Sequence, residues 1–281
     1  MARFTTSDGL DLYFEDEGTS EGRAAPILCL AGLTRNSGDF NFMLPFLAGH
    51  RVIRMDYRGR GQSDYAKDHT TYTIAQEAAD AIALLDHLEV ARVTILGTSR
   101  GGLIAMLLAA THPDRVAGAI LNDIGPEIDP GGLDRIMDYL GKRPPYADYA
   151  AAAAALRAAY VTTFPDVPEL RWRLQAQLMW RETPQGLDLR YDPHLRDAML
   201  DQAAAGPVPD LWPLFDAAAA KPLTVIRGAN SDLLSATSLS AMQARAPTMR
   251  AVTVPNRAHV PFLDEAPSLA AIHAHLQEFP E

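Results

Sequence analysis

"ILGTSRGG", residues 95–102, ends an apolar run and places one serine among three glycines. Its centre matches the pattern G-x-S-x-G, which carries chemistry when a strand precedes the serine and a helix follows it. Both are predicted here, because residues 93–97 are apolar and residues 100–112 are typical of a buried helix that ends before Pro113. We interpret the stretch as a tight turn that exposes Ser99 at a helix N-terminus, rather than a turn with an incidental serine.

Other apolar runs alternate with helical segments along the chain. A helix is predicted over residues 73–88, where Thr73 and Gln76 form a capping box. Two antiparallel strands are predicted around the Asp8-Gly9 turn. Further strands are predicted at 25–32, 50–61, 115–123, 222–228 and 249–256. These runs are apolar on both faces, which suits a parallel sheet covered by helices, so the sequence predicts an α/β doubly wound fold.

Strand signals vanish in the middle of the chain. This part instead carries helical stretches at 148–160 and 169–182, and prolines punctuate it. A helical block inserted between two strands is most simply a lid over the sheet. We therefore expect a core made of residues 1–125 and 207–281 and a helical cap made of residues 126–206.

Composition and charge argue against several classes of protein. Of the 281 residues, 48% are hydrophobic and 21% are charged, an ordinary balance for a globular chain, and no apolar run approaches the ~18 residues of a membrane span. The net charge of −10 argues against a duplex nucleic acid as partner. Residues 1–18 do not resemble a signal peptide, so we expect a cytoplasmic protein. The single cysteine, Cys29, excludes an intramolecular disulfide and is predicted to be a core residue.

A serine becomes a nucleophile when a base takes its proton and a carboxylate orients that base. Both partners should follow later strands of the sheet. His259 and Asp232 each do so, and the order Ser99, Asp232, His259 is serine, acid, histidine. The other histidines lie at a strand start, at a helix end, in the cap or on polar and amphipathic stretches, so we assign His259 as the base. Asp123 ends a strand and is the rival acid, with a turn-forming role as its alternative; we prefer Asp232.

The tetrahedral intermediate of acyl transfer also needs two donors for its oxyanion. One should be the backbone N–H of Arg100, directly after the serine. The other is predicted to be the N–H of Leu33, with Gly32 giving the backbone room to approach. Arg35 and Asn36, in the same loop, either reach the substrate or face solvent.

With these features the chain resembles the α/β-hydrolase superfamily over essentially its whole length except the cap. Besides the serine turn, DYRGRGQSD at 56–64 resembles the family's D-x-R-G-x-G-x-S turn, and THPDRVAGAIL and PFLDEAP are typical phrases. The resemblance implies Ser99 as nucleophile, Asp232 as acid and His259 as base. It also implies a helical cap between strands six and seven.

Two departures from the family pattern stand out. Ala31-Gly32 replaces the frequent His-Gly, which keeps the backbone donor but loses a side chain that buttresses the loop. Arg100 is larger than the residues common after the serine. It either places a positive charge beside the site or points into the boundary between core and cap and pairs with a carboxylate.

The predicted function is that of a serine hydrolase acting on a small carboxylic ester or lactone through an acyl-enzyme. Members of the family that act as epoxide hydrolases and haloalkane dehalogenases use an aspartate as nucleophile, so Ser99 favours acyl transfer. Hydrolysis of a C–C bond in a β-diketone or ring-cleavage product, and perhydrolase activity, use the same residues and stay open. A ligand receptor on a hydrolase scaffold is the alternative from another class.

The cap is expected to set the choice of substrate. Most of its aromatic residues should form the cap's own core, whereas Met179 and Trp180 are predicted to contact substrate. No metal-ligand spacing or phosphate-binding glycine loop is present, so we expect no metal and no cofactor. We expect a small-molecule substrate and neither a nucleic-acid nor a membrane partner, and the sequence leaves a homodimer open.

Overall fold

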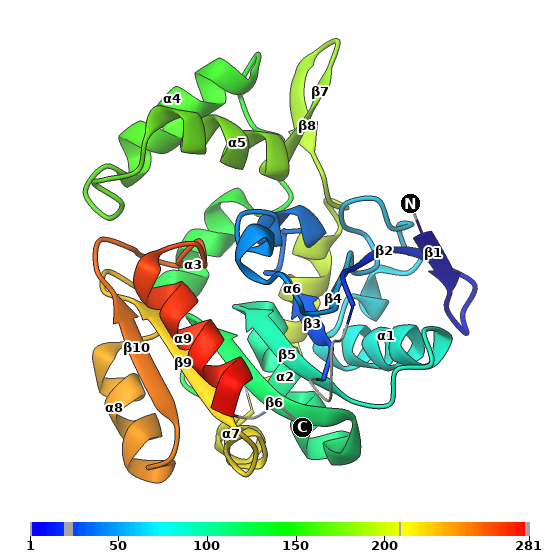
Figure 1. Ribbon diagram of the computed structural model, residues 1–281. Coiled ribbons are helices and arrows are strands. Elements are labelled where there is room, and N and C mark those ends of the chain that lie inside the picture. Colours follow the sequence, from blue (N-terminus) through cyan, green and yellow to red (C-terminus); the bar gives the residue numbers. More distant parts are fainter. Residues whose placement is uncertain (1, 20–24, 208, 279–281) are drawn as a thin grey trace.

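The computed structural model describes residues 2–19, 25–207 and 209–278, which are arranged around a central sheet (Figure 1). The sheet has eight strands in the order β1-β2-β4-β3-β5-β6-β9-β10. The pairs β1–β2 and β2–β4 are antiparallel, and all the other pairs are parallel. The strands are β1 (Ala2–Thr5), β2 (Asp11–Glu17), β3 (Ile27–Leu30), β4 (Val52–Met55), β5 (Val93–Thr98), β6 (Val116–Asn122), β9 (Leu223–Gly228) and β10 (Arg250–Val254). The predicted α/β fold is confirmed.

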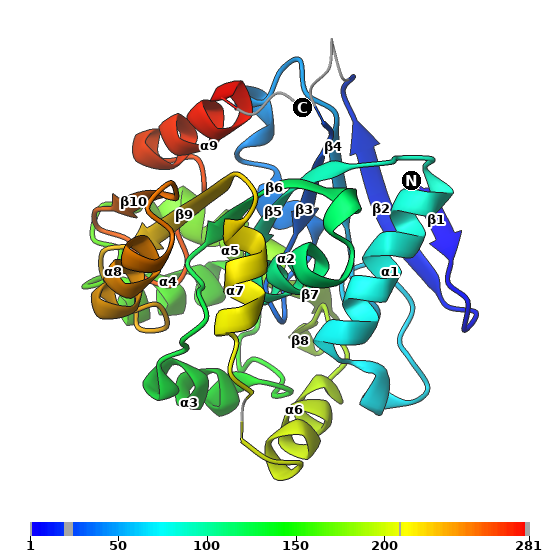
Figure 2. The same ribbon diagram turned by 90° about the horizontal axis from the view of Figure 1, so that it is seen from below.

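Helices cover both faces of the sheet, as strands that are apolar on both sides require (Figure 2). One face packs against α1 (Ile74–His87), α2 (Arg100–Thr111), α7 (Trp212–Ala219) and α8 (Ala236–Arg245), and the other against α9 (Ala266–Glu278). Successive side chains of β3 show the alternation, because Leu28 packs into the first core and Cys29 into the second. Cys29 is fully buried, which confirms it as a core residue.

Local signals in the sequence explain where the first helices begin and end. The Thr73 side chain accepts a hydrogen bond from the Gln76 N–H at 3.1 Å and so caps α1. Helix α2 ends at Thr111, two residues before Pro113. The turn at Asp8-Gly9 joins β1 to β2, as predicted.

Between β6 and α7 the chain forms a separate group of elements, which we call the cap segment (residues 126–206). It holds its own hydrophobic cluster, and Figure 1 shows most of it above the core. The elements are α3 (Pro130–Tyr139), α4 (Tyr149–Tyr160), α5 (Glu169–Met179), β7 (Trp180–Thr183), β8 (Gly186–Leu189) and α6 (Leu195–Ala204).

The prediction of a cap without strands is wrong at the β7–β8 hairpin. The predicted helix over residues 169–182 ends at Met179, and the chain continues as an antiparallel strand pair. Pro184 cannot continue a helix and biases the residue before it toward extended backbone. Gly186 then adopts φ 99°, which turns the chain back along β7.

Helix α2 approaches the sheet so closely that glycine is required at two positions. A Cβ added to Gly97 would lie 2.4 Å from the carbonyl oxygen of Gly101, and one added to Gly101 would lie 2.0 Å from that of Leu30. Both neighbours are backbone atoms, which cannot rotate away. The close approach forces the intervening Ser99 to φ 51° and ψ −115°, a strained conformation for a residue with a side chain.

We predict that Gly101→Ala lowers the free energy of unfolding by about 3 kcal/mol or more, because the added methyl group must separate α2 from β3. Equilibrium urea unfolding measures the change. Gly131→Ala is the matched control in the first turn of α3, since its Cβ meets only the movable Asp129 carboxylate at 3.3 Å. The control should change stability by less than about 1 kcal/mol. A loss of similar size in both variants would contradict the explanation.

Candidate active site

Three side chains that are far apart in the sequence form one hydrogen-bonded line at the carboxyl ends of the strands. Ser99 lies between β5 and α2, Asp123 follows β6, and His259 lies in the loop after β10. His259 Nε2 is 3.0 Å from Ser99 Oγ, and His259 Nδ1 is 2.7 Å from Asp123 Oδ2. The imidazole is 18% exposed and the carboxylate is fully buried. This arrangement has the geometry of a nucleophile, a base and an orienting acid.

The carboxylate of Asp123 is held by two further donors. The backbone N–H of Gly228 donates to Oδ1 at 2.7 Å, and the Ser231 hydroxyl donates to Oδ2 at 2.6 Å. The backbone of Asp123 itself adopts φ 57°. These contacts orient the carboxylate so that Oδ2 faces His259 Nδ1.

The prediction that Asp232 is the acid is wrong. Its carboxylate lies 2.6 Å from the guanidinium of Arg135 in α3. The neighbouring Ser231 instead donates a hydrogen bond to Asp123, the carboxylate that contacts the histidine. Asp123 already fills the place beside His259 Nδ1, which leaves the Asp232 side chain to contact the cap segment. Both aspartates follow strands, and only the conformations of their loops in space separate them.

The loop after β3 faces the serine, as predicted for an oxyanion loop. A Cβ placed on Gly32 would lie 3.8 Å from Ser99 Cβ, so the two backbones are close. Leu33 and Ser99 line the same cavity. Arg100 is the first residue of α2, whose leading N–H groups have no acceptor within the helix.

Two side chains that the sequence analysis did not single out hold this loop. The hydroxyl of Tyr57 donates to the carbonyl oxygen of Ala31 at 3.1 Å, and Arg60 Nε donates to that of Leu33 at 3.0 Å. Both come from the DYRGRGQSD turn, where they occupy variable positions of the D-x-R-G-x-G-x-S pattern. The two hydrogen bonds anchor the loop on either side of Gly32.

Arg60 belongs to a buried ionic cluster with Glu77 and Arg100. Glu77 Oε1 is 2.8 Å from Arg60 Nη1, and Glu77 Oε2 is 2.5 Å from Arg100 Nε. Arg60 and Glu77 are fully buried, and Arg100 is 6% exposed. Burial favours the neutral acid, but the two guanidinium groups outweigh it and lower the pKa of Glu77. The side chain of Arg100 therefore points away from the substrate cavity and pairs with a carboxylate, the second of its two interpretations.

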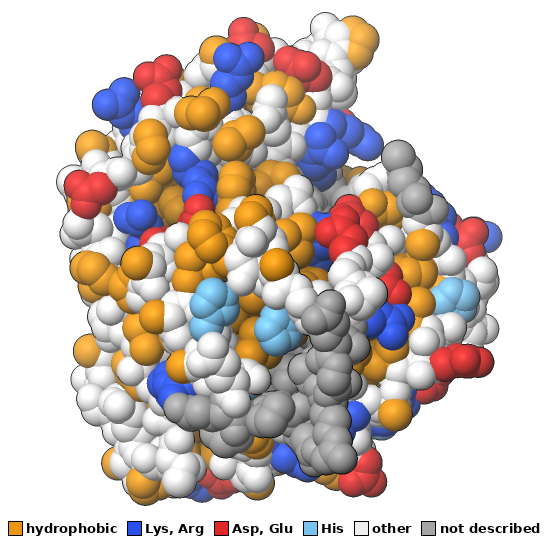
Figure 3. Space-filling model, in the orientation of Figure 1, with side chains coloured by type: hydrophobic (Ala, Val, Ile, Leu, Met, Phe, Trp, Pro, Cys, Tyr) orange, Lys and Arg blue, Asp and Glu red, His pale blue; other side chains and the backbone are white. Residues whose placement is uncertain are grey.

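A cavity of about 620 Å³ opens above Ser99 and His259 between the core and the cap segment. Met179, Trp180 and Arg35 line it, as expected for residues that contact substrate. Its wall is largely aromatic and aliphatic, with contributions from Tyr139, Tyr146, Leu156, Tyr160, Phe164, Trp172, Tyr191 and Phe262. Figure 3, in the same orientation as Figure 1, shows hydrophobic side chains spread over one face of the molecule, with Lys and Arg side chains among them. Such a volume suits a small organic substrate.

The two polar residues of the loop after β3 differ in role. Arg35 lines the cavity, but its guanidinium donates to the Asp39 carboxylate at 2.6 and 2.7 Å and to Gln175 Oε1 at 2.8 Å. Asn36 is not among the residues that line the cavity. Its side chain donates to the Leu178 carbonyl oxygen and accepts from the Gly38 N–H, so it joins the loop to α5. Asn36 neither lines the cavity nor faces solvent, so both alternatives predicted for it are wrong.

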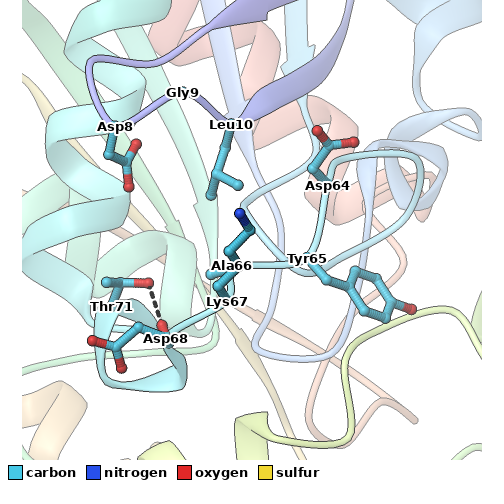
Figure 4. Close-up of a pocket in the computed structure, with 9 residues that line it drawn as sticks. All are labelled: Asp8, Gly9, Leu10, Asp64, Tyr65, Ala66, Lys67, Asp68 and Thr71. Atoms are coloured by element: carbon cyan, nitrogen blue, oxygen red, sulfur yellow. Dashed lines mark hydrogen bonds between the residues drawn. The ribbon is translucent and has the colours of Figure 1, made fainter.

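A second cavity, of about 470 Å³, lies at the turn between β1 and β2 and does not include the Ser99–His259 line (Figure 4). Two of its carboxylates are already paired, Asp8 with Arg58 at 2.9 Å and Asp64 with Arg3 at 3.0 Å. Within residues 2–19, 25–207 and 209–278, no three His, Cys, Asp or Glu side chains are grouped to hold a metal ion. In the same part of the chain, no helix has the length and apolar character needed to cross a bilayer.

Comparison with known proteins gives consistent matches. A family model described as alpha/beta hydrolase fold matches residues 25–266. The crystal structure of an alpha/beta hydrolase from Novosphingobium aromaticivorans superposes with a TM-score of 0.91 at 41% identity, covering 98% of this chain and 97% of the other. A 3-hydroxybutyrate-oligomer hydrolase from Cupriavidus necator is 36% identical over 252 residues, which is 85% of this chain and 84% of that protein. A 2-(acetamidomethylene)succinate hydrolase from Mesorhizobium japonicum is 28% identical over 85% of this chain and 83% of its own length.

We predict that Glu77→Ala lowers the free energy of unfolding by about 3–5 kcal/mol, since it leaves two buried guanidinium groups without their shared carboxylate. Asp86→Ala on the same helix is the control. Asp86 also pairs with an arginine, Arg115 at 2.7 Å, but its side chain is 62% exposed, so the loss should stay within about 1 kcal/mol. Urea unfolding of both variants measures the difference. Equal losses would show that burial of the cluster is not what stabilises this region.

Proposed function

Because this chain is a hydrolase of the alpha/beta hydrolase family, we propose that it cleaves small carboxylic esters through an acyl-enzyme formed on Ser99. One observation carries the proposal. Ser99 and His259, the first two members of the hydrogen-bonded line that continues to Asp123, face a cavity large enough for a small ester.

In the proposed reaction, His259 Nε2 takes the proton of Ser99 Oγ while that oxygen bonds to the substrate's carbonyl carbon. The backbone N–H groups of Leu33 and Arg100 donate to the oxyanion that forms. Asp123 accepts a hydrogen bond from Nδ1–H and stabilises the imidazolium without taking its proton. The C–O bond to the alcohol then breaks, and His259 returns its proton to the leaving oxygen. Water, deprotonated by His259, attacks the acyl-enzyme, and the carboxylic acid leaves as Ser99 regains its proton.

The size and lining of the cavity, together with the similarity to a named relative, support a substrate class. The relative from Cupriavidus necator is named for hydrolysis of 3-hydroxybutyrate oligomers, which are esters of a short hydroxy acid. The cavity here is mostly apolar and holds about 620 Å³, room for a short aliphatic ester on both sides of the reacting carbonyl. We therefore propose short-chain esters, including oligomers of hydroxy acids, as substrates. A serine at the nucleophile position supports acyl transfer over the chemistry of the family's aspartate enzymes.

Reaction with a fluorophosphonate tests the nucleophile. We predict one covalent adduct on the wild-type chain by intact mass and none on Ser99→Ala, because the phosphonylated intermediate needs the serine oxygen, the base and the oxyanion donors together. Ester hydrolysis by Ser99→Ala should fall by roughly 10³-fold or more, with unchanged thermal unfolding. An adduct that persists in the variant would assign the reaction to another residue.

Substitution of the two aspartates tests the acid. We predict that Asp123→Asn lowers kcat by roughly 10²- to 10⁴-fold, since an amide cannot stabilise the imidazolium and favours the wrong tautomer. Asp232→Asn removes only the ion pair to Arg135 and should change kcat by less than about threefold. Steady-state kinetics on a p-nitrophenyl ester gives both values. A larger effect at Asp232 would restore it as the acid.

A further inference from the structure

Three cationic side chains line the cavity above Ser99, and they differ in how their charge is compensated. Arg35 is paired with Asp39, as described above. Lys142 has no ion-pair or hydrogen-bond partner for its side chain among the described residues. Arg143 gives its Nε to the Leu187 carbonyl oxygen at 3.0 Å and its Nη2 to Thr183 Oγ1 at 3.2 Å, and both acceptors are neutral.

Acidic groups near these two cations do not pair with them. Asp138 lines the same cavity one turn before Lys142, but no ion pair within 4 Å joins the two. Asp188 lies near Arg143 and is paired instead with Arg181 at 3.2 Å. The two cations of the loop outnumber the single unpaired acid of the cavity wall, so a net positive charge remains there.

The backbone that carries the cations is fixed. Lys142 and Arg143 lie in the loop after α3, next to Gly141, which adopts φ 72° and whose N–H donates to the Tyr191 hydroxyl at 3.1 Å. The Arg143 side chain is tied to the β7–β8 hairpin by the contacts above. Both cationic side chains are exposed, whereas the Ser99–His259 line lies deeper. The cations therefore stand at the solvent side of the cavity, beyond the reacting groups.

This local charge opposes the charge of the whole molecule. The chain carries a formal net charge of −10, which repels an approaching anion at long range. Two cations without carboxylate partners at the mouth of the cavity make this mouth a favourable place for an anionic group. A lysine and an arginine at consecutive positions that line one cavity suit a carboxylate, since each can donate to a different oxygen.

We propose that Lys142 and Arg143 form a carboxylate subsite, so that the substrate is an ester whose alcohol portion ends in a free carboxylate. This inference rests on the proposed ester hydrolysis at Ser99. With the carboxylate at the cavity mouth, the ester carbonyl reaches Ser99 Oγ and the acyl group fills the apolar part of the cavity. Hydrolysis then adds water across the ester C–O bond and releases a carboxylic acid and a hydroxy acid. An oligomer of hydroxy acids is bound by its carboxylate end and shortened there.

The test uses a matched pair of esters. The butanoyl ester of a short hydroxy acid is compared with the same ester in which the free carboxylate is a carboxamide, and p-nitrophenyl butanoate reports basal activity. We expect the wild type to prefer the acid over the amide by about tenfold in kcat/KM, through KM, and this preference to shrink as salt rises from about 50 to about 500 mM. In the double variant Lys142→Ala, Arg143→Ala the ratio should fall to about one.

Two control variants separate the subsite from the overall charge and from the fold. Arg157→Ala with Arg173→Ala removes the same charge from exposed positions of α4 and α5 that do not line the cavity, and it should keep the preference. The exchange Lys142→Arg with Arg143→Lys retains both charges and should retain most of it.

Three outcomes would overturn the subsite. The first is equal wild-type rates on the acid and the amide while p-nitrophenyl butanoate is hydrolysed. The second is a loss of preference in the Arg157/Arg173 variant as large as in the Lys142/Arg143 variant. The third is a stronger preference for an ester whose alcohol ends in a phosphate, which would assign the cations to another anion. Failure of the wild type on all the esters, p-nitrophenyl butanoate included, would instead refute ester hydrolysis itself.

Discussion

The positions of Ser99 and of the loop that faces it depend on how closely α2 approaches the sheet. A side chain at Gly97 or Gly101 would fall within 2.4 Å of a backbone oxygen, so both positions exclude one. The approach brings the start of α2 beside the end of β3, and with it Ser99 beside the loop at Gly32. Contacts between backbone atoms therefore determine where the serine and the facing loop lie. The strain at Ser99 is the local cost of this packing.

The buried ionic cluster around Glu77 holds α2 and the loop after β3 in this arrangement. Three charged groups removed from water are costly unless they satisfy one another. Here Glu77 of α1 contacts Arg100 at the start of α2 and Arg60, whose Nε holds the Leu33 carbonyl oxygen. One carboxylate thus connects the helix that begins after the serine with the loop opposite it. An arginine after the serine, which looked in the sequence like a charge for the substrate, is instead part of this internal support.

The sequence predicted what depends on local pattern and missed what depends on position in space. The strand–turn–helix at Ser99, the capped start of α1 and the base position at His259 follow from short motifs and strand ends. The choice between Asp123 and Asp232 does not, because both follow apolar strands and only the path of the two loops in space decides which carboxylate faces the histidine. The β7–β8 hairpin was hidden for a related reason: Trp180 and Arg181 continue a helical pattern, and the turn at Gly186 overrides it.

The position of the acid after β6 also explains which contacts the loop after β9 makes. Because Asp123 reaches His259, this loop supplies only a hydroxyl to the line, from Ser231. Its remaining polar side chains are then available to the cap segment. Asn230 donates to the Thr163 carbonyl oxygen at 3.0 Å, and Asp232 pairs with Arg135. A single loop therefore contacts the buried acid, helix α3 and the turn that follows α4. The loop that supplies a hydrogen bond to the acid is therefore also a point of contact between the core and the cap segment.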